Sequence, residues 1–197
     1  MSAADPDLLE AELATLLGPE FVVSVAGPAP AGPAHDARAH RVEHRRGRAA
    51  LRCVADRLGE RVDTDRLVLP HPRLSLTHCA GVAVAVGVRS RFSTGIGVDL
   101  EAVRPVNPGI ARLFLTPAER AHLGEAPPDV LLRLWTVKEA VFKADTGNGG
   151  RILADYELCR PAAWSGRATR GAARFRYRTV ELPGHLVSVA VHEERTA

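Results

Sequence analysis

The sequence predicts an α+β fold made of two similar α/β subdomains related by a pseudo-twofold axis. Each half of the chain carries a long helical pattern ahead of β structure. Each half also closes on a strand in which valine recurs at every second position, at residues 82–88 and again at 186–192. We therefore place a boundary near residues 89–94, and expect an N-terminal subdomain at 1–92 and a C-terminal subdomain at 93–197.

The first half is predicted to hold two helices and three strands. Asp5 and Pro6 suit a helix cap and first turn, and leucines then recur at helical spacing until Gly18. An apolar run with β-branched residues favours a strand at 21–25. The remaining elements are a Gly/Pro/Ala-rich connection at 27–39, a helix at 42–58, and two strands at 74–78 and 82–88.

Arginines crowd the start of the helix predicted at 42–58. They are Arg41, Arg45, Arg46, Arg48 and Arg52. The positive end of a helix dipole lies at the same end, so this charge opposes local stability. Two interpretations remain: an anion binds nearby, or flexible arginines lie on a solvated face at little cost.

The second half is predicted to begin with a strand at 95–101 and to end with three strands. A capping box marks a short helix between them, with Thr116 as N-cap and Glu119 three positions later. Asp129 can cap a longer helix, which glycines at 147–150 end. The closing strands are expected at 152–158, 175–180 and 186–192. Arginines at 174, 176 and 178 alternate with apolar or small side chains, which favours a solvated basic face.

Two carboxylates share one face of the strand at 95–101. Because side chains alternate along a strand, Ile96, Val98 and Leu100 point one way, while Asp99 and Glu101 point together the other way. Gly97 has no side chain on the acidic face and would let a ligand approach the backbone. Paired oxygen ligands suit Mg²⁺ that shares its shell with substrate phosphates. The alternative is two ordinary surface acids at a strand end.

The helix near residues 130–144 carries the only two lysines of the chain. The other 24 of the chain's 26 lysine and arginine residues are arginine. On a 3.6-residue period, Trp135, Glu139 and Lys143 lie on one face, opposite an apolar stripe at 130, 134, 137, 141 and 144. That face is free for chemistry, or Glu139 and Lys143 form an i,i+4 surface ion pair. Lys138 points about 100° away and is either structural or partner-facing.

Composition narrows the functional classes. An aromatic content of 5% and a net charge of +3 do not favour base stacking or nucleic-acid binding, which would rest only on the basic strand at 174–178. Three widely spaced cysteines suggest neither a disulfide framework nor a zinc site. The N-terminus does not resemble a secretory leader, and no stretch approaches a membrane span. We expect a soluble cytoplasmic protein that binds neither membrane nor nucleic acid; the resemblance described next implies that it is a monomer.

These segments together resemble the 4′-phosphopantetheinyl transferases of the monomeric, two-subdomain kind, which act on carrier proteins of polyketide, fatty-acid and nonribosomal peptide synthases. Two signatures of the family, G-[IV]-D-x-E and W-x-x-K-E-[AS]-x-x-K, are filled at residues 97–101 and 135–143. Residues 43–50 are similar to the family's arginine-bearing helix, and residues 75–81 to its Ser/Thr-His hairpin. The joint occurrence is far more specific than any one segment.

The resemblance implies a 4′-phosphopantetheinyl transferase fold and a role for each matching residue. It implies Mg²⁺ ligands at Asp99, Glu101 and Glu139, coenzyme A contacts at Arg41, Arg48, Thr77, His78, Asp99 and Lys143, and catalytic roles for Glu139 and Lys143. Glu139 is the candidate base for the serine hydroxyl of an apo acyl or peptidyl carrier protein, because a base must lie within hydrogen-bond reach. The products would be the modified carrier and adenosine 3′,5′-bisphosphate.

The sequence departs from the family's pattern at two places. Residues 63–72 contain no lysine, whereas many relatives carry one there that reaches coenzyme A; Arg66 and Arg73 are the available substitutes. At the start of the arginine helix, His40 and Arg41 compete for the position of a basic residue. The alternative function is a non-catalytic module with the same fold that binds coenzyme A or a carrier protein.

Overall fold

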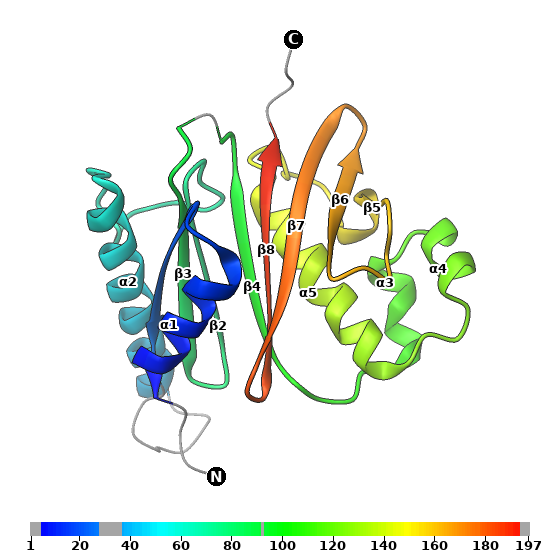
Figure 1. Ribbon diagram of the computed structural model, residues 1–197, viewed down its shortest axis with the longest axis horizontal. Helices are drawn as coiled ribbons and strands as arrows, with labels where there is room; N and C mark the ends of the chain where they lie inside the picture. Colours follow the sequence, from blue (N-terminus) through cyan, green and yellow to red (C-terminus); the bar gives the residue numbers. More distant parts are fainter. Residues whose placement is uncertain (1–4, 28–36, 92, 194–197) are drawn as a thin grey trace.

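The computed structural model describes residues 5–27, 37–91 and 93–193, with side chains throughout these ranges except at 37–43. It is an α+β structure organised by two antiparallel sheets, with the strand orders β1-β3-β2 and β4-β8-β7-β6-β5 (Figure 1). The strands are β1 (Phe21–Ala26), β2 (Leu74–Cys79), β3 (Val82–Val88), β4 (Ile96–Ala102), β5 (Glu157–Leu158), β6 (Ser165–Arg170), β7 (Ala173–Leu182) and β8 (His185–Glu193).

The helices of the described ranges pack on these sheets and beside them. They are α1 (Pro6–Leu17), α2 (Ala37–Leu58), α3 (Ala111–Phe114), α4 (Pro117–Leu123) and α5 (Pro128–Ala144), with single 3₁₀ turns at Pro108–Ile110 and Leu153–Asp155. The predicted caps of α1 and α4 are confirmed: Asp5 accepts a hydrogen bond from the Asp7 amide, and Thr116 and Glu119 form a capping box. None of the helices within the described residues is long and apolar enough to cross a bilayer.

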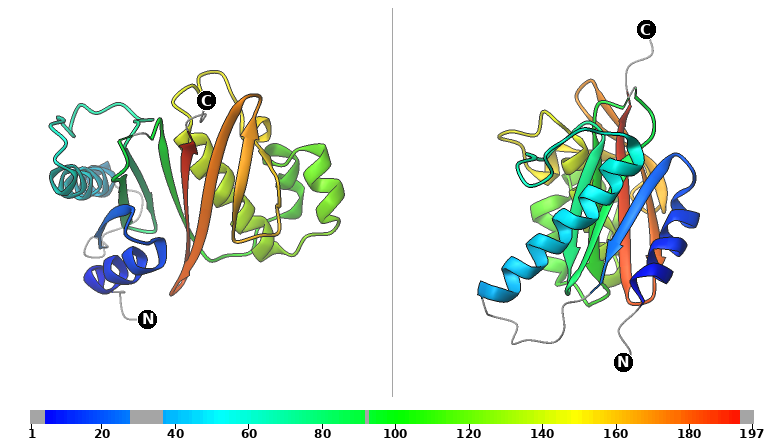
Figure 2. Two further views of the ribbon diagram at one scale, coloured as in Figure 1. Left: turned by 45° about the horizontal axis from the view of Figure 1, so that its top comes forward. Right: turned by 90° about the vertical axis from the view of Figure 1, so that its left-hand side faces the viewer.

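A single core joins the two sheets beneath α1. The valines at 82, 84, 86 and 88 of β3 point into it, together with Ile96, Val98 and Leu100 of β4. Helix α2 covers the other face of the first sheet, and α5 covers the other face of the second. Figures 1 and 2 show α1 and α5 on opposite sides of the second sheet. The predicted division at residue 92 falls between β3 and β4, but the core is continuous across it.

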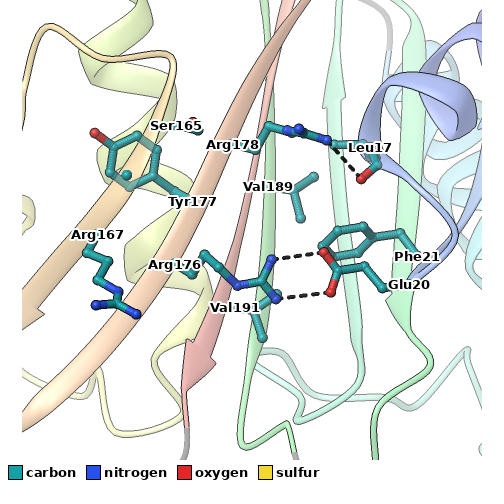
Figure 3. A pocket seen from close by; sticks show the side chains of 11 residues that line it. Leu17, Glu20, Phe21, Ser165, Arg167, Arg176, Tyr177, Arg178, Val189 and Val191 are labelled. Carbon is teal, nitrogen blue, oxygen red and sulfur yellow. Dashed lines mark hydrogen bonds and ion pairs between the residues drawn. The ribbon is translucent and has the colours of Figure 1, made fainter.

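The basic face of β7 is exposed, as predicted, since Arg174, Arg176 and Arg178 are exposed and alternate with buried residues, but two of these arginines also have partners within the protein. Arg176 makes a two-pronged ion pair with Glu20, at 2.8 and 3.0 Å (Figure 3). Arg178 Nη1 donates to the carbonyls of Leu16 and Leu17, the last residues of α1. These carbonyls have no N–H donor further along the helix, and they lie at the negative end of its dipole. The arginines therefore fasten α1 to the second sheet.

Four details of the predicted elements differ from the structure. The strand expected at 152–158 is a 3₁₀ turn followed by the two-residue β5. Strand β6 was not predicted, because its sequence S-G-R-A-T-R has no apolar alternation. Helix α2 begins five residues before the predicted start. Pro127, rather than Asp129, is the N-cap of α5, and Asp129 lies in the first turn. The pseudo-twofold axis and the two-subdomain division stay predictions.

Candidate active site between β4 and α5

Two glycines allow α5 to lie directly on β4. A Cβ atom at Gly97 would stand 1.9 Å from the Ala140 carbonyl oxygen and 2.6 Å from the Ala144 amide nitrogen. A Cβ atom at Gly95 would stand 1.8 Å from the Ala144 carbonyl oxygen. The expectation that Gly97 leaves space for a ligand is therefore wrong, because the backbone of α5 occupies that space. The glycines instead bring the functional face of the helix close to the strand.

The alternation on β4 directs its carboxylates toward α5. Ile96, Val98 and Leu100 are buried in the shared core, as the strand period predicted. Asp99 and Glu101 consequently point to the other face, where α5 packs. The prediction that the two acids share one face is confirmed, because each of them has a hydrogen-bond partner on that helix.

The residues at 135, 139 and 143 of α5 lie along this acidic face. Trp135 Nε1 donates to Glu101 Oε1 at 3.1 Å, and Lys143 Nζ donates to Asp99 Oδ1 at 2.6 Å. Lys143 thus pairs with Asp99 across the two elements, and the described residues contain no ion pair between Glu139 and Lys143. The apolar stripe of α5 is buried at 134, 137, 141 and 144, as predicted, and half-buried at Val130. Glu139 and Lys143 therefore do not form the local i,i+4 surface pair, and Lys143 instead contacts a residue that is distant along the chain.

Strand β2 reaches the site through side chains instead of a backbone ladder. Ser75 Oγ accepts from the Val98 amide at 3.0 Å, and Cys79 Sγ accepts from the Ala102 amide at 3.3 Å. Between them, Thr77 Oγ1 donates to Asp99 Oδ1 at 3.3 Å. These three side chains alternate along β2. Two of them accept hydrogen bonds from backbone amides on the facing edge of β4, and the third donates to a β4 carboxylate. They also bring the first sheet into contact with the carboxylates of the second.

Burial and mutual repulsion raise the pKa values of two carboxylates. The pKa of Asp99 rises to about 6, chiefly because the group is buried, although Lys143 opposes the rise and the charges of Glu139 and Glu101 add to it. The pKa of Glu139 is also raised, by burial first and by the charge of Glu101, with Lys143 again opposing. The three acids therefore lie close enough to destabilise one another's charge.

The carboxylate chemistry fits a divalent cation. Asp99 Oδ2 is buried and has no hydrogen-bond partner within the described ranges. An unpartnered buried carboxylate oxygen is costly, and a hard cation would satisfy it. The described part of the chain holds no group of three His, Cys, Asp or Glu side chains already close enough to bind a metal. The ligand set Asp99, Glu101 and Glu139 therefore stays a prediction that rests on donor type and proximity.

Lys138 has a structural position, which decides between its two predicted roles. Its Nζ is fully buried, pairs with Glu119 Oε2 at 2.7 Å and also donates to the Tyr156 carbonyl. Glu119 additionally accepts from the amides of Thr116 and Leu158, both at 2.7 Å. This network fastens α4 and β5 to the side of α5 that is remote from Asp99. The sequence holds no local signal for it, since the partners are distant along the chain.

The residues expected at the nucleotide end have varied surroundings. Thr77 is buried against Asp99, whereas His78, the next residue of β2, is exposed. Arg48 Nη1 donates to the carbonyls of Thr64 and Leu67, at 2.6 and 3.1 Å, while its Nε has no partner within the described residues. Arg41 lies in the part of α2 whose side chains are outside the described residues. The nucleotide contacts of all four stay predictions.

The sequence did not indicate three residues that shape the site. Ser75 and Cys79 bridge β2 to β4, and Arg104 Nη2 pairs with Glu101 Oε2 at 3.3 Å. Alternation along β2 could have placed Ser75 and Cys79 on the face of Thr77. The partner strand, however, is 23 residues away for each bridge and is not encoded locally.

Comparisons with known proteins agree with this geometry. Residues 95–190, which include β4, α5 and the first part of β8, match the model of the 4′-phosphopantetheinyl transferase superfamily. A curated relative from Streptomyces mobaraensis, 4′-phosphopantetheinyl transferase Svp, is 36% identical over 75 residues, which cover 36% of this chain and 30% of the relative. The alignment thus spans under a third of the relative's length. Together these matches confirm the resemblance that the sequence motifs indicated: over residues 95–190 the chain carries the signature of the 4′-phosphopantetheinyl transferase superfamily.

Proposed function

We propose that this protein transfers the 4′-phosphopantetheine group of coenzyme A to a serine hydroxyl of an apo acyl or peptidyl carrier protein, in a reaction that requires Mg²⁺. One observation carries the proposal. Within the region that matches the superfamily, Asp99 and Glu101 of β4 face Glu139 and Lys143 of α5. The proposal includes a cytoplasmic monomer that binds neither membrane nor nucleic acid.

The residues of this site divide the chemistry between them. Asp99, Glu101 and Glu139 would hold Mg²⁺, which when bound neutralises the pyrophosphate charge and improves the leaving group. Lys143, with 32% of its side chain exposed, has the freedom to extend from Asp99 to a phosphate oxygen. The serine oxygen attacks the β-phosphorus, and the bond from that phosphorus to the bridging oxygen breaks. Adenosine 3′,5′-bisphosphate leaves with the bridging oxygen.

Glu139 is the proposed acceptor of the serine proton, directly or through one water. Its raised pKa brings it nearer to neutral pH, where a general base transfers protons most efficiently. Its carboxylate makes no hydrogen bond within residues 5–27, 37–91 and 93–193, so both of its oxygens are available to accept a proton. Asp99, by contrast, already accepts from Thr77 and Lys143.

A carrier-modification assay tests the function. The pure protein is incubated with coenzyme A, Mg²⁺ and a panel of apo carrier proteins, and intact mass is measured. Transfer adds about 340 Da to at least one carrier, as the phosphoryl-transfer chemistry requires. Glu139→Gln should abolish the increase, while Glu12→Gln, at an exposed position of α1, should preserve it. A folded protein that modifies no carrier in the panel would contradict the proposal.

A non-catalytic module that binds coenzyme A or a carrier protein is the second candidate. It is favoured by the lack of lysine at 63–72, where many relatives carry one that reaches coenzyme A. Titration calorimetry separates the two. An enzyme should bind coenzyme A more tightly with Mg²⁺ than with a chelator, whereas a module should bind equally in both conditions and transfer nothing.

A further inference from the structure

The indole of Trp135 is held in one orientation beside Glu101. Its ring meets Phe114 edge-on, with centroids 5.3 Å apart and planes at 87°. In that orientation Nε1 donates to Glu101 Oε1 at 3.1 Å, while Arg104 contacts the other oxygen. An indole N–H only donates, so this contact fixes a carboxylate oxygen as its acceptor. The contact leaves Glu101 little freedom to rotate.

Asp99 is held in the same manner, by Thr77 of the first sheet and by Lys143 of α5. Thr77 Oγ1 and Lys143 Nζ both donate to Oδ1, which leaves Oδ2 as the unpartnered oxygen. Thr77 is itself 6% exposed and lies between the bridges that Ser75 and Cys79 make to β4. Its hydroxyl therefore cannot move far from the carboxylate. The donors select which oxygen stays available.

We propose that Thr77 and Trp135 are positioning residues that aim the carboxylates of Asp99 and Glu101 at the cation, an inference that rests on the proposed function. A carboxylate rotates freely in water. A hydrogen-bond donor on one of its oxygens holds the group in one rotamer, so that the other oxygen already points toward the cation site. Such outer contacts are worth about 10- to 100-fold in metal affinity. This role for Thr77 differs from the nucleotide contact that the resemblance implies, and Trp135 has no other assigned role.

Two binding measurements test the inference without reference to turnover. The first is the affinity of the apo protein for Mn²⁺ alone, followed by electron paramagnetic resonance of the free ion. We expect Thr77→Val and Trp135→Phe each to weaken Mn²⁺ binding about 10-fold or more. Thr77→Ser, which keeps the hydroxyl, should stay within about threefold of wild type. The second is the affinity for coenzyme A in chelator, which positioning leaves unchanged in Thr77→Val.

Matched variants control for general effects of these substitutions. Thr136→Val removes another buried hydroxyl, one that donates only to the Leu132 and Arg133 carbonyls of α5. Trp164→Phe changes the second tryptophan, whose ring stacks with Arg133 at 4.9 Å. Both should bind Mn²⁺ as wild type does. Circular dichroism verifies that every variant is folded.

The outcomes separate this inference from the function on which it rests. A wild-type protein that binds no Mn²⁺ would overturn both. Wild-type binding that is unchanged in Thr77→Val and Trp135→Phe would overturn the positioning roles alone. Loss of coenzyme A affinity in chelator by Thr77→Val, with Mn²⁺ affinity intact, would assign Thr77 to the nucleotide instead.

Discussion

Replacing Gly97 by alanine tests the packing on which the whole site depends. The added methyl group would stand 1.9 Å from the Ala140 oxygen, 2.6 Å from the Ala144 nitrogen and 2.9 Å from the Lys143 carbonyl carbon. All three atoms belong to the backbone of α5, so no side-chain rotation can relieve the overlap. Because Cβ atoms essentially never approach closer than 3.0 Å, the Ala140 carbonyl must retreat by about 1.1 Å, the difference between 3.0 and 1.9 Å.

The retreat has consequences for both stability and activity. Overpacking of a filled interior typically costs about 1–3 kcal/mol, and a backbone obstacle places Gly97→Ala at the upper end of that range. The displaced helix carries Glu139 and Lys143 away from Asp99. A misplacement of about 1 Å in a catalytic site can lower the rate about 100-fold. We therefore expect transfer to fall far more than the folded fraction does.

Urea unfolding followed by tryptophan fluorescence gives the change in free energy, and the carrier-mass assay gives the rate at equal concentrations of folded protein. Gly149→Ala is the matched control, because a Cβ atom there meets nothing within 4 Å. The reasoning is refuted if Gly97→Ala unfolds within about 0.5 kcal/mol of wild type, the ordinary range for surface substitutions, and transfers at the same rate.

Three further predictions concern groups outside the acidic face. Lys138→Met should lower the free energy of unfolding by about 3–5 kcal/mol, because it leaves the Glu119 charge buried and unpaired; a loss under about 1 kcal/mol by urea titration would contradict this. Burial lowers the pKa of His192 below its usual 6.5, so stability should fall as pH drops below 6.5, and His192→Phe should flatten that slope in pH-resolved thermal melts; an unchanged slope would exclude His192 as its source. Arg178→Met should lower the free energy of unfolding by about 1 kcal/mol in urea titration, since the last carbonyls of α1 lose their donor. Arg174→Met loses only bonds to nearby carbonyls in its own hairpin and should cost less. Equal costs would argue against the role of Arg178 in holding α1 on the second sheet.

Local periodicity accounts for what the sequence determined. The two-residue period of β4 assigned Val98 to the core and Asp99 to the opposite face, and the helical period of α5 set Glu139 and Lys143 apart from the apolar stripe. Capping chemistry placed the starts of α1 and α4. Each of these inferences uses residues within a few positions of one another, and each depends on the geometry of a single element. The superfamily motifs follow from the same local stretches.

The tertiary structure decided which elements meet, and with them the partners of the lysines and of Asp99. Lys143 could pair with Glu139 by sequence, yet it pairs with Asp99, 44 positions away. The space beside Gly97 could have held a ligand, yet the backbone of α5 occupies it. Lys138 could have faced a partner, yet it is buried with Glu119. Ion-pair strength and burial depend on distance in space, which a chain does not encode at any one position, so these roles emerged only when the helix was packed on the strand.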